Sequence, residues 1–244
     1  QYKNSTKPVI RSFPIGSDDN MEGPVEIYEM PKKDKSGSIP SGRYIASCDP
    51  VDDDGNEDKS LSLQSAHILD TYTDRIVAEY TSRTQIAETY YEQLRRLLLF
   101  FNARVNYENQ KKGLYGYFKN KNSTYLLTDT PQILSDTDLA KIQHIGNKKK
   151  GTAASEKVNA YGRRLILSYL LRQAYGQEEG VCNMHMIRSV ALLKELIMWS
   201  KDINADRVSS LGMLMILREE VIESIDREER TYKTMANDSF WDEQ

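Results

Sequence analysis

The stretch Tyr44–Gly55 reads YIASCDPVDDDG, a short apolar run that ends on an aspartate before a proline and an acidic turn. Proline has no backbone N–H for a sheet ladder, so Pro50 is expected to close a strand just after Asp49. Asp49 would then lie at a strand end, with its carboxylate free to point into a cleft. An Asp-Pro pair is also common where a turn merely begins. The stretch alone leaves both interpretations open.

Composition makes a packed soluble core possible. The 244 residues are 39% hydrophobic and 28% charged, enough for one large domain or two small ones. The longest apolar run, Leu97–Phe101, falls far short of the roughly 20 residues that span a bilayer. The start, at Gln1, lacks a signal-peptide pattern and fits a fragment of a longer protein. Two distant cysteines, Cys48 and Cys182, argue against a disulfide framework and for a reducing compartment.

The net charge of −3 does not indicate a dedicated duplex-binding domain, which is usually basic. Charge is nevertheless uneven along the chain, because acids crowd residues 52–58 and the last thirty positions. Basic residues cluster at 111–112, 119–121, 148–150 and 163–164. The pattern fits a basic face beside an acidic cleft, and it equally fits an ordinary mixed surface.

The first half of the chain predicts a sheet. Residues 1–40 are expected to be a linker with one peripheral strand at Val25–Tyr28. Three strands joined by short loops then form an antiparallel meander: Tyr44–Asp49, Leu61–Asp70 and Arg75–Thr81. Within the second of these strands, the His67 side chain points to the opposite face from Ile68 and is expected to be exposed.

A helix and further strands follow the meander. Thr84 is expected to cap a helix that runs to about Phe101, and the strand Ala103–Glu108 returns parallel to a neighbour. A helix is expected at Leu114–Lys119 and a fifth strand at Ser123–Leu127. Residues 128–152 show no clear periodicity.

The last part of the chain predicts helices at Ser155–Tyr175, Met186–Ser200 and Arg207 to about Arg230. The whole pattern indicates an α/β fold, with three antiparallel strands, then parallel strands, and helices on both faces of a mixed sheet. We expect one domain over residues 41–230 and a flexible C-terminal tail over 231–244.

Three carboxylates are expected to converge in this topology. Asp49 ends the first strand, Glu108 ends the strand beside it, and Asp206 begins the last helix. Carboxylates on separate rigid elements suit hard divalent cations such as Mg²⁺, which also relieve their mutual repulsion. Each acid has a plainer alternative, and Asp206 in particular could simply cap its helix.

The chain resembles the nuclease domain of the terminase large subunit, the DNA-packaging motor protein of tailed bacteriophages. Four segments over roughly residues 40–220 carry the resemblance: Ala46–Pro50 with its acidic turn, Arg75–Tyr80, Val105–Asn109 with Gly113, and Asn204–Leu211. The third of these segments resembles the family's E-N-x-x-G segment. The last resembles its D-D-x-v-x-A-l helix start, although Asn204 and Ala205 stand where many members carry a further acid or a histidine.

The resemblance implies an RNase H-like fold and a metal-dependent endonuclease that cuts concatemeric viral DNA during genome packaging. It implies that Asp49, Glu108 and Asp206 bind two divalent ions, Mg²⁺ or Mn²⁺, and act as the catalytic residues. The implied partners are double-stranded DNA, the ATPase half of the same chain, and the portal and small terminase subunit, with no membrane. No Walker A motif occurs, so the ATPase half is expected to be missing from this sequence. The implied location is the host-cell cytoplasm.

Lysines are expected to contact the duplex backbone. Lys111 and Lys112 follow Glu108 at a helix start, and Lys148, Lys149 and Lys150 form a run that could grip phosphates or simply be solvated. Two other functions stay open: a resolvase- or transposase-type nuclease of the same fold, and a catalytically silent module that binds DNA or the portal.

Overall fold

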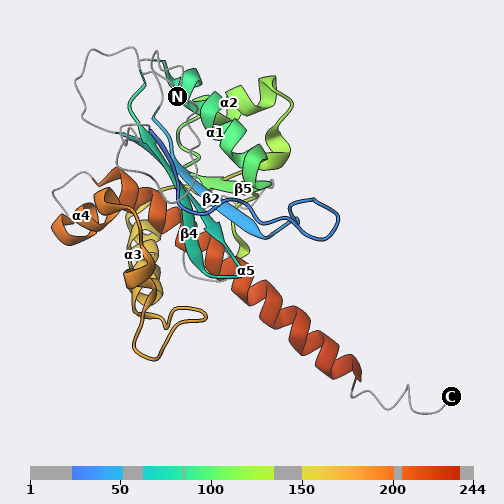
Figure 1. Ribbon diagram of the computed structural model, residues 1–244. Coiled ribbons are helices and arrows are strands. Elements are labelled where there is room, and N and C mark those ends of the chain that lie inside the picture. The colour runs from blue at the N-terminus through green and yellow to red at the C-terminus, as the bar shows by residue number, and fades with distance from the viewer. Residues whose placement is uncertain (1–23, 52–62, 85, 135–149, 201–204, 237–244) are drawn as a thin grey trace.

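The computed structural model describes residues 24–51, 63–84, 86–134, 150–200 and 205–236 (Figure 1). Side chains are described up to Ser224 in the last helix. The expected strand residues Leu61 and Ser62, Lys148 and Lys149, most of the expected N-terminal linker and the last eight residues lie outside these ranges.

A five-stranded mixed sheet forms the centre of the molecule. Its strands are β1 (Val25–Ile27), β2 (Tyr44–Asp49), β3 (Gln64–Asp70), β4 (Arg75–Ser82) and β5 (Arg104–Tyr107). The order across the sheet is β1-β4-β3-β2-β5. Every neighbouring pair is antiparallel except β2 and β5, which run parallel. The predicted α/β class with a mixed sheet is therefore confirmed, and β1 is the expected peripheral strand.

One face of the sheet packs on α1 (Ala87–Phe101) and α2 (Gly113–Asn120) (Figure 1). Helix α1 presents Tyr90, Leu94 and Leu98 to the sheet, as its apolar spacing predicts. It ends at Asn102, which adopts a left-handed conformation with φ of 50° and donates its backbone N–H to the last turn. The chain then enters β5 directly, which makes α1 the crossover between the antiparallel meander and the parallel strand.

The other face packs on α3 (Glu156–Leu171), α4 (Val190–Met198) and α5 (Asp206–Ala236). Helices α3 and α5 cross at Gly162 and Gly212, where a Cβ atom added to Gly162 would lie 3.2 Å from the Gly212 backbone. The two glycines therefore allow the helix axes to approach closely. Past the sheet, α5 extends away from the rest of the molecule (Figure 1).

Several local predictions are wrong. His67 is fully buried rather than exposed, because helices cover both faces of the sheet and every residue of β3 is enclosed. The expected fifth strand, Ser123–Leu127, is instead a short 3-10 helix, η1 (Thr124–Leu126), and only Leu127 bridges to Val105 of β5.

Helix boundaries also differ from the prediction. The expected Met186–Ser200 helix is divided into a 3-10 turn, η4 (Asn183–Met186), and α4, which begins where Ser189 caps the Leu192 amide. Helix α3 ends at Leu171 rather than at Tyr175. Helix α5 continues to Ala236, so the first six residues of the expected tail are helical.

Candidate metal centre

Parallel pairing of β2 and β5 brings Asp49 and Glu108 together. Cys48 pairs with Tyr107 across the two strands, so the next residue of each strand is Asp49 and Glu108. The Glu108 backbone N–H donates to the Cys48 carbonyl at 3.2 Å, which extends the ladder to this point. The two carboxyl groups lie close enough for Glu108 to raise the pKa of Asp49.

Strand alternation fixes the face to which both acids point. Ser47 lies 2.9 Å from Ser210 of α5, and the Asn106 side chain donates to the Met213 carbonyl of α5 at 3.0 Å. Asp49 and Glu108 each stand two residues further along, and positions two apart share a face. Both carboxylates therefore lie on the α5 side, at the carboxyl ends of their strands.

Asp206 lies at the start of α5, the helix that covers this face. It is the first residue of α5, and its Oδ2 accepts a 2.6 Å hydrogen bond from the Leu63 backbone N–H. Leu63 leads into β3, where Ser65 pairs directly with Asp49. Three separate elements thus bring the three predicted site residues to the same end of the sheet, where β2 and β5 finish.

Electrostatics at this end of the sheet disfavour ionisation of Asp49. Burial raises the pKa of Asp49 well above its ordinary value, and the charge and hydrogen bond of Glu108 and the charge of Asp206 raise it further. Lys111 acts in the opposite direction. A divalent cation would remove the conflict, because its charge favours the ionised form of each acid.

The donor set fits a hard cation in its chemistry, since all three groups supply carboxylate oxygens. In the described residues, however, no three side chains of the His, Cys, Asp and Glu types converge closely enough to hold an ion. Asp206 accepts the Leu63 amide with one oxygen. Glu108 and Asp206 each act on Asp49 through their charge.

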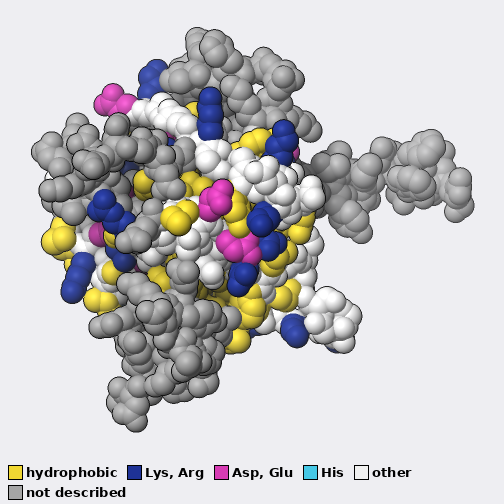
Figure 2. All heavy atoms as spheres, turned by 90° about the horizontal axis from the view of Figure 1, so that it is seen from above, with side chains coloured by type: hydrophobic (Ala, Val, Ile, Leu, Met, Phe, Trp, Pro, Cys, Tyr) yellow, Lys and Arg dark blue, Asp and Glu magenta, His cyan; other side chains and the backbone are white. Residues whose placement is uncertain are grey.

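The predicted DNA-contacting lysines differ in their position and in their partners. Lys111 is close enough to influence Asp49, and Lys112 precedes the first residue of α2. Lys150 forms a 2.8 Å ion pair with Asp129 and donates to the Leu127 carbonyl. Seen from above, acidic side chains lie near the middle of the face with basic side chains beside them (Figure 2).

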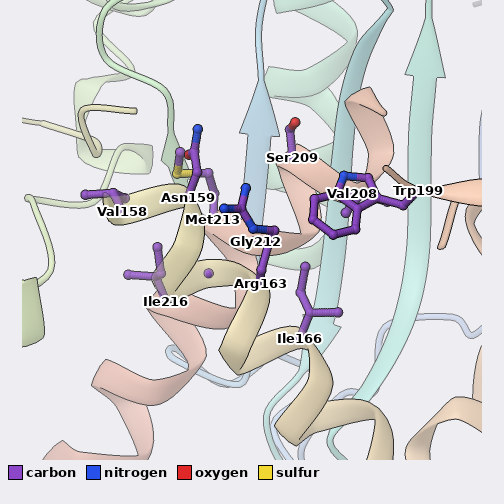
Figure 3. A pocket seen from close by; sticks show the side chains of 11 residues that line it. Val158, Asn159, Arg163, Ile166, Trp199, Val208, Ser209, Gly212, Met213 and Ile216 are labelled. Carbon is purple, nitrogen blue, oxygen red and sulfur yellow. The ribbon is translucent and has the colours of Figure 1, made fainter. Parts of the chain in front are cut away.

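Two hollows lie elsewhere and lack the chemistry of a metal centre. The first sits at the crossing of α3 and α5, where Arg163 lies 5.2 Å from the centre of the Trp199 ring (Figure 3). No acidic, histidine or cysteine side chain lines it. The second includes Asp74, but that carboxylate is bound by Arg218 through two 2.6 Å hydrogen bonds.

The sequence analysis missed a set of buried polar residues beneath α5. Ser47, His67 and Glu79 occupy the α5 face of β2, β3 and β4, whereas the residues that flank them pack on the α1 side. The signal was present as alternation, because each of the three polar residues stands between two apolar ones. Alternation shows that His67 faces away from the apolar neighbours Ala66 and Ile68, but it does not show that α5 buries that face.

No protein-family model matches this chain, and no curated protein matches it. Within the part of the chain that the structure describes, no helix combines the length and the apolar character needed to cross a membrane.

Proposed function

We propose that this chain is a metal-dependent DNA endonuclease domain with an RNase H-like fold, of the kind found in the terminase large subunit. The observation that supports it best is the register that sets Asp49 and Glu108 at neighbouring strand ends, with Asp206 close enough to raise the pKa of Asp49. The topology agrees, since an antiparallel meander is followed by a helical crossover and a strand parallel to the first one of the meander.

In this proposal Asp49 is the shared ligand, because it lies between the other two acids. Glu108 and Asp206 each complete one side of the site. Two Mg²⁺ or Mn²⁺ ions, when bound, would supply an activated water and stabilise the negative charge that develops on the scissile phosphate. Asp206 would have to share or release the Leu63 amide to contribute both of its oxygens.

The duplex would approach the ends of β2 and β5 that carry Asp49 and Glu108. Lys111 is placed to hold a phosphate close to Asp49, since it already acts electrostatically on that carboxyl group. Such contacts carry no sequence information, which suits an enzyme that cuts with little sequence preference. An ATPase half, the portal and the small terminase subunit are the partners that belong to this proposal.

Linearisation of supercoiled plasmid tests the proposal. Wild-type protein should cut in Mg²⁺ or Mn²⁺ and not in EDTA, and Asp49→Asn should lower the rate at least 100-fold. Asp34→Asn is the matched control, because Asp34 is an exposed acid whose carboxylate only binds its own loop at Ser36 and Ser38. Equal cutting by wild type and Asp49→Asn would refute the site assignment.

The same assay separates the alternatives. A resolvase- or transposase-type enzyme would prefer branched DNA or defined ends over plain plasmid, so a substrate panel distinguishes it. A silent binding module would shift DNA in a gel without cutting it in any metal, and its binding would be indifferent to Asp49→Asn.

A further inference from the structure

A row of polar side chains crosses the sheet directly beneath α5. Asn106, Ser47, His67 and Glu79 are paired in register from β5 through β2 and β3 to β4. The exposed fraction of these residues is at most 3%. A sheet face that packs on a helix is normally apolar, because buried polar groups need partners. The row therefore requires a physical explanation.

Helix α5 provides a partner for every member of the row. Arg207 Nε donates to Glu79 Oε1 at 2.6 Å. Ser210 Oγ lies 2.9 Å from Ser47 Oγ and 3.1 Å from His67 Nδ1, and the Met213 carbonyl accepts from Asn106. Positions 207, 210 and 213 follow one another at intervals of three, so they share one side of the helix.

Directional contacts of this kind fix a helix in a way that apolar packing does not. A slide of one residue moves a helix by about 1.5 Å along its axis, and apolar surfaces can tolerate such a slide. The same slide would break the hydrogen bonds at all three positions of α5. Buried polar groups that specify register are known from coiled coils, where they do so at a cost in stability.

The first turn of α5 is also hydrogen-bonded to α4. Arg207 Nη1 binds Glu195 Oε1 of α4 at 2.6 Å, and the Arg207 backbone N–H donates to the same carboxylate at 3.0 Å. Burial lowers the pKa of His67, with the charge of Glu79 acting against this shift and that of Arg207 adding to it. Asp206 immediately precedes Arg207, so whatever fixes Arg207 also fixes the site carboxylate.

We propose that this polar row is a positioning device that sets α5 on the sheet and so places the Asp206 carboxylate beside Asp49 and Glu108. Ser47, His67, Glu79, Asn106, Arg207 and Ser210 are its positioning residues. None is a catalytic residue, because the row is buried beneath α5 and does not reach the surface where a substrate would lie. The role assigned to Asp206 rests on the proposed function, whereas the placement of α5 does not.

The experiment compares Ser210→Ala with Leu217→Ala. The first variant removes the hydroxyl group that joins Ser47 and His67. The second removes apolar atoms from the same core between α5 and the sheet, three residues beyond Leu214, without touching a hydrogen bond to the row. Glu79→Gln, which removes the charge that binds Arg207, replaces Ser210→Ala if that variant does not fold.

Hydrogen exchange of the Leu63 amide reports the position of Asp206, since that amide donates to Asp206 Oδ2. Exchange is followed by NMR under conditions where global unfolding does not contribute, and Asp206→Ala sets the rate without an acceptor. Ser210→Ala should raise the Leu63 exchange rate about 10-fold, and Leu217→Ala should leave it within about threefold of wild type. Equal rates in the two variants would overturn the inference.

Calorimetric titration with Mn²⁺ supplies the link to function. Ser210→Ala should weaken Mn²⁺ binding about 10-fold, whereas Leu217→Ala should bind it within twofold of wild type. If wild-type protein binds no Mn²⁺, the proposed function fails, and the Leu63 exchange rates still decide whether the row positions α5. If Mn²⁺ binds equally to both variants, the row serves stability and not the site.

Discussion

Replacing Asp49 by Asn should stabilise the metal-free protein. Burial together with the neighbouring Glu108 and Asp206 raises the pKa of Asp49 well above its ordinary value. The folded state therefore resists the charge that this carboxyl group carries in the unfolded chain at pH 7. Asparagine removes the charge, retains nearly the same shape, and can donate a hydrogen bond to Glu108.

The size of the effect follows from the charges involved. Two carboxylates about 4 Å apart repel by about 4 kcal/mol at the dielectric typical of a protein surface. Asp49 can also escape this repulsion by taking up a proton, which at pH 7 costs an aspartate of ordinary pKa about 4 kcal/mol. The destabilisation therefore cannot exceed about that value. Lys111 offsets part of it, so we expect Asp49→Asn to gain about 2 kcal/mol. For a chain of this size that gain corresponds to about 4–8 °C in Tm.

Thermal unfolding in EDTA, monitored by circular dichroism from pH 3.5 to pH 8, measures this difference. The folded state tolerates Asp49 best in its protonated form. Below the unfolded-state pKa of about 3.9 the group is protonated in both states and costs no stability. As the pH rises through the folded-state pKa, that stability is lost. The two proteins should therefore be equally stable near pH 3.5, and the advantage of the variant should grow toward pH 8. Saturating Mn²⁺ should reverse the order, because it would stabilise only the wild type.

Either of two results would refute this reasoning. Asp49→Asn could be less stable than wild type in EDTA at pH 7, which would mean that the carboxylate is structurally satisfied. Alternatively, a stability difference independent of pH would mean that repulsion between the acids is not its cause. Asp34→Asn, at an exposed loop, should show no gain over the same range.

Two further predictions concern the framework of the site. Gly151 has φ of +75°, and an added Cβ would lie 2.5 Å from the Tyr107 carbonyl, so Gly151→Ala should cost more than about 2 kcal/mol in chemical denaturation. Gly176→Ala is the control, because Gly176 has φ of +67° and an added Cβ would have nothing within 4 Å. It should cost about 1 kcal/mol from the positive φ alone, and equal losses in the two variants would contradict the predicted clash. Arg218→Met removes two 2.6 Å bonds to Asp74 and should lower stability by about 2 kcal/mol with little dependence on salt. The exposed pair of Arg96 with Glu92 is the control, where Arg96→Met should cost less than about 0.5 kcal/mol, and similar losses in both would show that burial does not govern the Arg218 pair.

Much of the sheet could be predicted from local patterns. Alternation located the meander, and a helix of crossover length between Arg75–Thr81 and Ala103–Glu108 indicated the parallel strand. The same alternation failed for His67, because it reports that two faces differ without reporting what covers each one. Ser123–Leu127 has the composition of a strand, but only Leu127 pairs with β5, and a strand requires a partner along its length.

The sequence by itself determined which residues could end a strand or begin a helix, since proline, apolar spacing and capping side chains act within a few positions of the chain. It thereby identified Asp49, Glu108 and Asp206 as acids at element boundaries. Only the tertiary structure decided that the first two lie at neighbouring strand ends and that the third binds the Leu63 amide, because register between strands and the placement of a helix depend on contacts between distant residues. The polar row beneath α5 belongs to this second class, since Ser47 and Ser210 are 163 residues apart in the chain and 2.9 Å apart in space.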